Sequence, residues 1–585
     1  MTMTPGRETM QCTSSLSARR RSLRLSIFAC SLLAAGLTTL PACAHDQGND
    51  ESSKSGPTVT TTEGPVHGST KNGVNIFLGI PYAAPPVGNL RWQPPQAVKR
   101  WKTSLDATQY APTCPQVTEL GAFAGPASVN EDCLYLNVFT TGSGRNKKPV
   151  IVWIHGGGNV DGESNDYDGS KLATGGPNGT ETVVVTMNYR LGLFGTFSNP
   201  AINSEGHLWG NYGTLDQQAV LRWVQRNIAS FGGDPTRVTL GGQSAGAYDT
   251  ASQVLSPLSA GLFNRAIYQS SPGFFSFLPS ASDALTRGTN FATAAGCSGS
   301  NAATAKCLRT LSAARILQLQ GTPNADGPYT TASPFVDGTI IPVTPEQAWT
   351  TGRFNKMPVM GGATKDEMTF LTGISEYFSG PPQVPMTAAQ YATAVAEGTP
   401  GCNWCNGGKF PAGAAAKYPL SDYDNDPMIA FERALTDPAK CRELHVLQKI
   451  APQVQTYAYD FTYRDLPYYF PKMPGFKPLA SHTIDIQLLF PGYHGGNLGV
   501  NLDQESGAPR ELNGKETHLS DQLVAAWTNF AKSGNPNGSG NSPWPKLTAD
   551  ANGKYFVQDI PLSTTTVSQF RADYKCDFWD PTFTY

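Results

Sequence analysis

The sequence has little charge and nothing that divides it into parts. Charged residues make up only 15% of its 585 residues, and the formal net charge is −2. Without an excess of positive charge there is no electrostatic field to attract nucleic acid, so no nucleic-acid partner is expected. Internal repeats and long Gly/Ser- or Pro-rich linkers are also absent. Since large α/β folds can run well beyond the usual domain length, we expect residues 58–585 to form one domain.

Long apolar runs are absent except near the start of the sequence. A basic stretch that ends at Arg24 overlaps the apolar residues 23–40, and small residues follow at Ala42 and Ala44. This order predicts a signal peptide over residues 1–44, followed by a polar tether over 45–57. A membrane anchor is the alternative, but the stretch is short and interrupted by small polar residues.

Two cleavage sites fit the end of this segment. Cleavage before His45 follows a small-x-small pattern, whereas cleavage before Cys43 follows a sequence that resembles a bacterial lipobox and would leave Cys43 lipidated. Both predict an exported protein that is secreted, periplasmic or anchored to the outer envelope. A membrane is expected as a partner only through a lipid on Cys43.

Eight of the eleven cysteines remain after such cleavage, and an even number in an exported chain suggests four disulfides. Short loops would be closed by Cys114–Cys133 and Cys297–Cys307, and a tight clip by Cys402–Cys405. The fourth pair, Cys441–Cys576, would tie the last segment to the body. The alternative for Cys402 and Cys405, a redox or zinc pair, lacks a second CxxC or a nearby histidine.

Short apolar runs alternate with helical patterns along most of the chain. Apolar runs at 150–154, 182–186, 237–240, 265–268, 358–360 and 455–463 predict buried strands, and 214–228 has helical spacing. We expect a large, mostly parallel sheet with helices on both faces, preceded by antiparallel strands over 74–138. Residues 274–338 and 372–434 are predicted to be insertions that form a lid or pocket wall.

The segment Gly242-Gln-Ser-Ala-Gly246 follows the strand predicted at 237–240 and precedes a helical pattern at 247–255. This context is typical of a nucleophile elbow, a turn so tight that side chains at its two glycines would clash. The following helix directs its N-terminal dipole at the serine. Ser244 is therefore the predicted nucleophile.

Three glycines follow His155 directly after the strand predicted at 150–154. Acyl transfer needs donors for the negative charge that develops on the carbonyl oxygen, and bare glycine backbone can approach that oxygen closely. We expect the N–H groups of Gly157, Gly158 and Ala245 to form the oxyanion hole.

A serine nucleophile also needs a base and an orienting acid. His482 and His494 lie late in the chain, where hydrolases of this type place the base, and spacing does not separate them. For the acid, Asp366 and Glu367 follow the strand predicted at 358–360. This reasoning does not decide between His482 and His494 as the base, or between Asp366 and Glu367 as the acid.

Several motifs resemble those of type-B carboxylesterases, the family of cholinesterases and para-nitrobenzyl esterase. They include Phe77–Tyr82, Glu131–Val138, Asn188–Arg190, Gly210–Gly213 and Phe231–Pro235. The resemblance runs from about Thr58 to the C-terminus and implies an α/β-hydrolase fold. It also supports three of the four disulfides, the exception being Cys402–Cys405.

The same resemblance implies Glu367 as the acid and His482 as the base, with His494 as the runner-up. Met368, Thr483 and Asp485 depart from the family pattern around these two positions. Gln243 stands where many relatives carry Glu, which removes a negative charge beside the nucleophile. We expect this change to weaken any preference for cationic substrates.

Together these features predict a serine carboxylesterase that acts on neutral esters through an acyl-enzyme and needs no cofactor or metal. Gln243, Phe274, Phe275 and Phe277 are candidates for the substrate pocket, although the three phenylalanines fit core packing nearly as well. A lipase for long acyl chains is one alternative. A catalytically silent binding protein is the other, although such relatives typically lack the serine. The natural ester and the oligomeric state are not encoded in any recognisable pattern.

Overall fold

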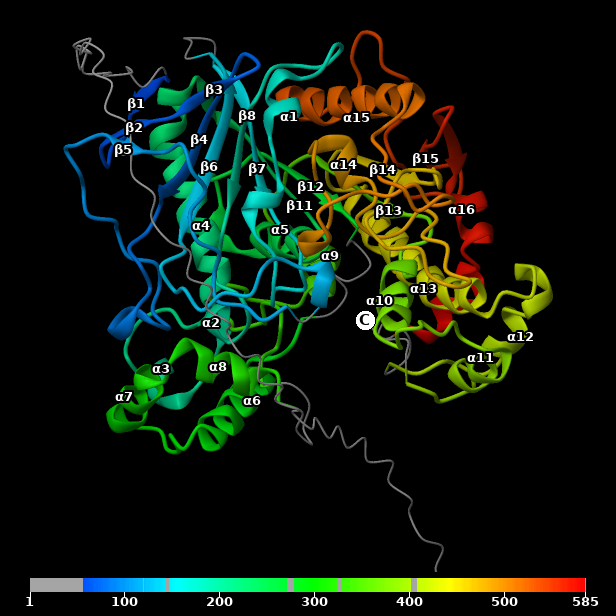
Figure 1. The fold of residues 1–585 in the computed structure, drawn as a ribbon, viewed down its shortest axis with the longest axis horizontal. Coiled ribbons are helices and arrows are strands. Elements are labelled where there is room, and N and C mark those ends of the chain that lie inside the picture. Colours follow the sequence, from blue (N-terminus) through cyan, green and yellow to red (C-terminus); the bar gives the residue numbers. More distant parts are fainter. Residues whose placement is uncertain are drawn as a thin grey trace, which may run out of the picture. The chain divides into compact units, whose positions relative to one another are not determined.

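A mixed sheet of eleven strands forms the centre of the fold (Figure 1). The computed structural model describes residues 56–118, 120–142, 147–270, 278–322, 329–400 and 408–583. Within these residues the strands lie in the order β16-β15-β14-β13-β12-β11-β7-β8-β6-β4-β3. Their bounds are β3 Ser69–Lys71, β4 Val74–Pro81, β6 Tyr135–Thr141, β7 Lys148–Ile154, β8 Val183–Met187, β11 Gly233–Gln243, β12 Arg265–Gln269, β13 Val359–Thr364, β14 Thr456–Phe461, β15 Lys554–Gln558 and β16 Ser563–Thr566.

The seven strands from β8 to β15 in this order are parallel, and the antiparallel pairs lie at the two ends of the sheet. Strands β3, β4, β6 and β8 pair antiparallel, as do β15 and β16. The expected mostly parallel sheet with an antiparallel N-terminal portion is therefore confirmed. Every residue of β7, β8, β13 and β14 is buried, because helices cover both faces.

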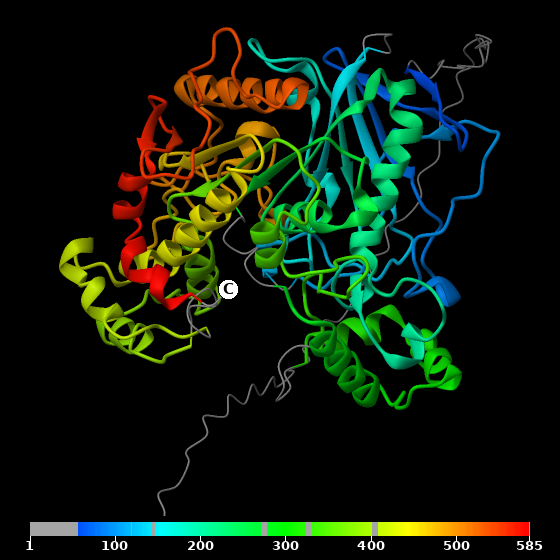
Figure 2. The same ribbon diagram turned by 180° about the vertical axis from the view of Figure 1, so that it is seen from behind.

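The alternation along β7 separates the two faces. Val150 and Val152 belong to one apolar core, which includes residues of helices α4 (Tyr212–Asn227), α5 (Ala245–Leu255) and α13 (Pro427–Ile450). Ile151 and Trp153 belong to another core, with residues of α1 (Ser170–Thr174) and α15 (Gly514–Ser533). Seen from behind, α4 and α13 lie in front of the strands (Figure 2).

Several of the remaining helices come from the two predicted insertions. The first contains α6 (Ala281–Ala294), α7 (Ala302–Thr310) and α8 (Ala313–Gln320). In the second, α11 (Ala388–Ala394) and α12 (Ala414–Lys417) follow α10 (Thr369–Tyr377), which begins just before it. The other short elements are α2 Gly192–Gly195, α3 Pro200–Asn203, α9 Pro345–Thr351, α14 Ile486–Leu489, α16 Val567–Asp573, α17 Cys576–Trp579, β1 Thr58–Thr60, β2 Pro65–His67, β5 Leu105–Asp106, β9 Thr196–Phe197 and β10 Gly210–Asn211.

Three of the four expected disulfides are formed. They join Cys114 to Cys133, Cys297 to Cys307 and Cys441 to Cys576, with Cα–Cα distances of 4.9, 5.6 and 5.3 Å. The predicted pair Cys402–Cys405 lies outside the described residues, as do the signal peptide and most of the tether. In the part of the chain that is described, no helix has the length and apolar character needed to cross a bilayer.

Candidate active site

Ser244 lies in a sharp turn between β11 and α5. Its φ of 57° and ψ of −126° are unusual for a residue with a side chain, and its N–H donates to the Gln269 carbonyl at 2.9 Å. A Cβ on Gly242 would lie 2.4 Å from the carbonyl carbon of Gly246, and one on Gly246 would lie 2.0 Å from the Ile154 oxygen. The turn thus requires both glycines, and it places Ser244 immediately before the helix.

The glycine loop after β7 lies against this turn. An ideal Cβ on Gly156 would lie 3.1 Å from the Ser244 Cβ, so the two segments are in close contact. Gly157 has a φ of 108°, and any side chain there would meet the Asp161 carbonyl at 2.1 Å. Within the described residues, the N–H groups of Gly157 and Gly158 donate no hydrogen bond. They line the same cavity as Ser244 and His482.

The imidazole of His482 is hydrogen-bonded to the carboxylate of Glu367 through Nδ1. Glu367 follows β13, and its Oε1 accepts from the N–H and the hydroxyl of Thr364 at 2.7 and 2.9 Å. Burial would raise the pKa of Glu367, but the neighbouring imidazole of His482, followed by Ser270 and Lys440, lowers it to about 2. A carboxylate at Nδ1 keeps the proton on that nitrogen, which leaves Nε2 as the proton acceptor of the neutral ring.

Gln243 contacts this acceptor nitrogen. Its Nε2 lies 3.1 Å from the Nε2 of His482, and the side chain is buried in the wall of the Ser244 cavity. A neutral amide therefore occupies the position that would carry a negative charge in a relative with Glu.

The other candidates from the sequence lie elsewhere. His494 lines a separate cavity with Lys171 and Gln487. Asp366 forms an ion pair with Arg464, with distances of 2.7 and 2.6 Å between the two oxygens and the guanidinium nitrogens. His155 is buried, which lowers its pKa to about 4, and it stacks on Tyr189.

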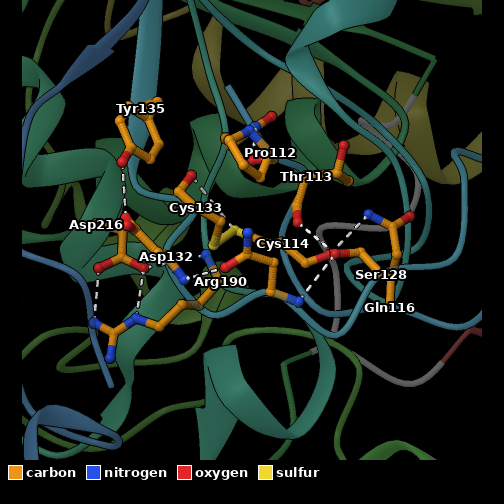
Figure 3. Close-up of a disulfide and its surroundings, with 12 residues drawn as sticks. Pro112, Thr113, Cys114, Gln116, Ser128, Asp132, Cys133, Tyr135, Arg190 and Asp216 are labelled. Atoms are coloured by element: carbon orange, nitrogen blue, oxygen red, sulfur yellow. Dashed lines mark hydrogen bonds and ion pairs between the residues drawn. A yellow bond between two sulfur atoms is a disulfide. The ribbon is translucent and has the colours of Figure 1, made fainter. Parts of the chain in front are cut away.

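The loop closed by the Cys114–Cys133 disulfide, shown in Figure 3, contacts the segment that follows the glycine loop. The Gln116 side chain donates to the Gly162 carbonyl at 3.0 Å and accepts from the Gly162 N–H at 2.8 Å. The buried pair Arg190–Asp216 lies next to the disulfide in Figure 3. Gln116 carries no motif that would have identified it, because its role depends on a contact across 46 residues.

The walls of the cavity contain groups that the sequence analysis missed. Five aromatic rings line it, namely Phe123, Tyr167, Phe370, Tyr469 and Tyr493. Three carboxyl groups, of Asp161, Glu163 and Asp166, line it as well. Burial and the nearby Glu163 raise the pKa of Asp166 to about 7. The predicted pocket residues Phe274, Phe275 and Phe277 lie outside the described residues.

Several known proteins are similar to this chain over most of its length. Carboxylesterase 1C of Rattus norvegicus is 33% identical, over 88% of this chain and 91% of its own length. A medium-chain fatty acyl-CoA hydrolase precursor of Anas platyrhynchos is 32% identical, over 94% and 95% of the two chains. Among solved structures, PNB esterase, an α/β-hydrolase, has a TM-score of 0.68 and 29% identity, over 90% of this chain and 99% of its own.

The fold is therefore that of an α/β-hydrolase, as expected. The model of the carboxylesterase family matches residues 55–579. With this match and these relatives, the chain is an esterase and belongs to the carboxylesterase family.

Proposed function

We propose that the protein hydrolyses carboxylic esters with Ser244 as nucleophile, His482 as base and Glu367 as the orienting acid. The observation that carries the proposal is one cavity that holds Ser244, at a nucleophile elbow, together with the His482 ring that is bonded to Glu367. A serine hydroxyl needs such a base, and the base needs such a carboxylate.

The reaction proceeds in two steps through an acyl-enzyme. The Nε2 of His482 takes the proton of Ser244 as its Oγ attacks the ester carbonyl, and the same proton then leaves with the alcohol. Water repeats the sequence and frees the acid. Since the Gln243 amide lies on Nε2 in the free protein, it has to move aside before Ser244 can pass its proton to that nitrogen.

The oxyanion is bound by the N–H groups of Gly157, Gly158 and Ala245. The first two line the cavity without other hydrogen bonds in the described residues, and Ala245 begins α5 directly after the nucleophile. Donors held in this way stabilise the developing charge without reorganisation, and the loss of one typically costs about 3 kcal/mol.

The substrates are neutral carboxylic esters. Three carboxyl groups in the cavity wall disfavour a negatively charged acyl or alcohol part, because like charges repel strongly at a partly buried site. Gln243 adds no negative charge beside the nucleophile, and burial raises the pKa of Glu163 and Asp166, which reduces the negative charge of the wall that could attract a cation. The aromatic rings of the wall favour apolar acyl or aryl groups.

Export is part of the same proposal. The three disulfides fit an oxidising compartment, and the predicted signal peptide over 1–44 would deliver residues 58–585 there as one domain. Mass spectrometry of the mature N-terminus tests this directly, since it distinguishes a chain that begins at His45 from a lipidated Cys43.

A chain-length series of para-nitrophenyl esters, from acetate to palmitate, tests the catalytic proposal. We expect the wild type to hydrolyse the short esters fastest, S244A to have lost at least about 10⁵-fold in kcat/KM, and the exposed control S568A to be unchanged. Wild-type activity that survives in S244A contradicts the proposal, and no turnover by the wild type favours a binding protein. A maximum at the longest chains identifies a lipase instead.

A further inference from the structure

A second cavity, of about 760 Å³, lies between helices α10, α11 and α13 (Figure 1). Its volume falls in the range of small-molecule sites. Most of its lining is apolar, and two of these residues are strongly exposed at its rim, Leu371 at 44% and Val384 at 56%. The other apolar lining residues are Met386, Ala389, Ala394, Met428, Phe431 and Leu435.

Glu376 is a buried carboxyl group in the wall of this cavity. Only 3% of its surface is exposed, yet both carboxylate oxygens lack a hydrogen-bond partner among the described residues. A buried polar group without a partner costs free energy, and a buried carboxylate costs more. An α-helical position in contact with a cavity of this size would tolerate an apolar residue, so packing does not explain the glutamate.

The surroundings of Glu376 carry negative charge only. Asp426, the residue before α13, is the charged group that acts on Glu376, and it caps the helix by accepting from the N–H groups of Met428 and Ile429. The next charged residues of α13 are engaged elsewhere, Glu432 with Thr436 and Arg433 with Asp437. Neither α11 nor residues 378–387 contain a charged residue, and none of the described residues that line the cavity is basic.

We propose that this cavity binds an amphiphilic primary amine, whose ammonium group pairs with Glu376 while its hydrocarbon chain lies along the apolar wall. An ammonium group supplies the donors and the positive charge that the carboxylate lacks, and a charge-assisted hydrogen bond is about twice as strong as a neutral one. An anionic ligand is repelled by both Glu376 and Asp426.

This site is distinct from the catalytic cavity, although α10 contributes to both. Phe370 faces the catalytic cavity and lies 5.6 Å from the His482 ring, whereas Leu371, Thr372 and Glu376 line the second cavity. Because amine binding in the second cavity does not involve Ser244, its test does not depend on the proposed esterase reaction.

Isothermal titration with n-octylamine, n-octanol and octanoate, three probes of one chain length, tests the proposal on the full chain. We expect saturable binding of octylamine to the wild type at pH 8, at least ten-fold weaker binding to E376Q, and unchanged binding to E397Q, which alters an exposed glutamate beyond α11. Octanol is expected to bind more weakly than octylamine, and equally to the wild type and E376Q.

The pH dependence and a second variant complete the test. Burial and Asp426 raise the pKa of Glu376 to about 7, so octylamine should bind more tightly at pH 8 than at pH 5.5 in the wild type but not in E376Q. A389W fills the cavity from α11 and should abolish binding without altering the carboxyl group. The proposal is overturned if octylamine shows no saturable binding to the wild type, or binds the wild type and E376Q equally. It is also overturned if octylamine still binds A389W, or if octanoate binds as tightly as octylamine.

Discussion

Replacement of Glu367 by Gln removes the carboxylate at Nδ1 of His482 and keeps the shape of the side chain. The pKa of this carboxyl lies at about 2 instead of 4.5, and each unit corresponds to about 1.4 kcal/mol. After the cost of burial, interaction with protonated His482 and the neighbouring donors therefore favours the carboxylate by about 3 kcal/mol. In the proposed mechanism protonated His482 forms during each acylation and deacylation step, so much of this stabilisation would act in the transition state.

We expect E367Q to lose at least about 100-fold in kcat, since 1.4 kcal/mol corresponds to a factor of ten. The loss should reach about 10⁴-fold if the new amide donates to Nδ1, because that bond holds the imidazole in the tautomer that cannot accept the serine proton. KM should change much less, since Glu367 is buried behind His482 and is not among the residues that line the cavity.

The assay is hydrolysis of para-nitrophenyl butyrate, with the concentration of active sites measured by covalent titration with an organophosphonate. E376Q is a matched control, because it makes the same exchange at another buried glutamate that has no contact with His482. If E367Q retains more than a tenth of the wild-type kcat with an intact fold, Glu367 is not the acid of the triad and the argument from its lowered pKa is refuted.

Four further predictions follow from the same contacts. Q243E should favour protonated His482, so the acid limb of the kcat/KM profile should move to higher pH and choline esters should gain over neutral esters; equal specificity contradicts this. H482A should abolish turnover, whereas H494A should leave kcat within a few-fold of wild type; the reverse result would make His494 the base. Loss of the Cys114–Cys133 disulfide by paired serine substitutions should lower stability by about 3 kcal/mol for a loop of this length and should also reduce kcat; an unchanged melting temperature and kcat would contradict this. Glu376 keeps its proton in the folded state up to about pH 7, so the free energy of unfolding of the wild type should fall as pH rises from about 4.5 to 7. E376Q should lack this fall, so its melting temperature should exceed that of the wild type by more at pH 8 than at pH 4.5. Parallel curves of melting temperature against pH for the two proteins would show that the carboxyl is not buried as described.

Local patterns were sufficient to predict the sharp turn at Ser244 and much of the sheet. The turn at Ser244 depends on Gly242 and Gly246, which lie within one five-residue segment and which leave no room for a side chain. The strand predicted at 150–154 corresponds to β7, which begins two residues earlier, at Lys148. It could be predicted because a strand that is buried on both faces needs a continuous apolar run. These features required no knowledge of distant contacts.

Contacts between distant segments could not be predicted in the same way. Gln116 holds Gly162 across 46 residues, and no periodicity in the sequence marks it. The carboxyl groups of Asp161, Glu163 and Asp166 follow the glycine loop closely, but their meeting in one cavity wall depends on how that loop folds back. Glu376 reads as an ordinary polar residue of a helix until the cavity beside it is known.

Contacts with distant segments, and not the local sequence, distinguish Asp366 from Glu367. Asp366 forms an isolated β-bridge and Glu367 lies in the turn that follows it, and the two carboxyl groups meet different partners. Asp366 meets Arg464 and also accepts from the N–H of Ala480 at 3.1 Å, while its own N–H donates to the Ala480 carbonyl at 3.0 Å. The backbone bond belongs to an isolated parallel bridge between Asp366 and Ser481.

The bridge sets the register of the next pair along the two segments, which is Glu367 and His482. The His482 N–H donates to the Glu367 carbonyl at 3.4 Å, so backbone as well as side chains join the two residues. If the proposed roles of Glu367 and His482 hold, Asp366 is a positioning residue that holds the acid and the base together although 115 positions separate them in the chain. D366N should weaken this anchor, and it should lower kcat while leaving the form of the pH profile intact, because Glu367 keeps its charge. A changed profile with an unchanged kcat would instead assign Asp366 a direct role in proton transfer.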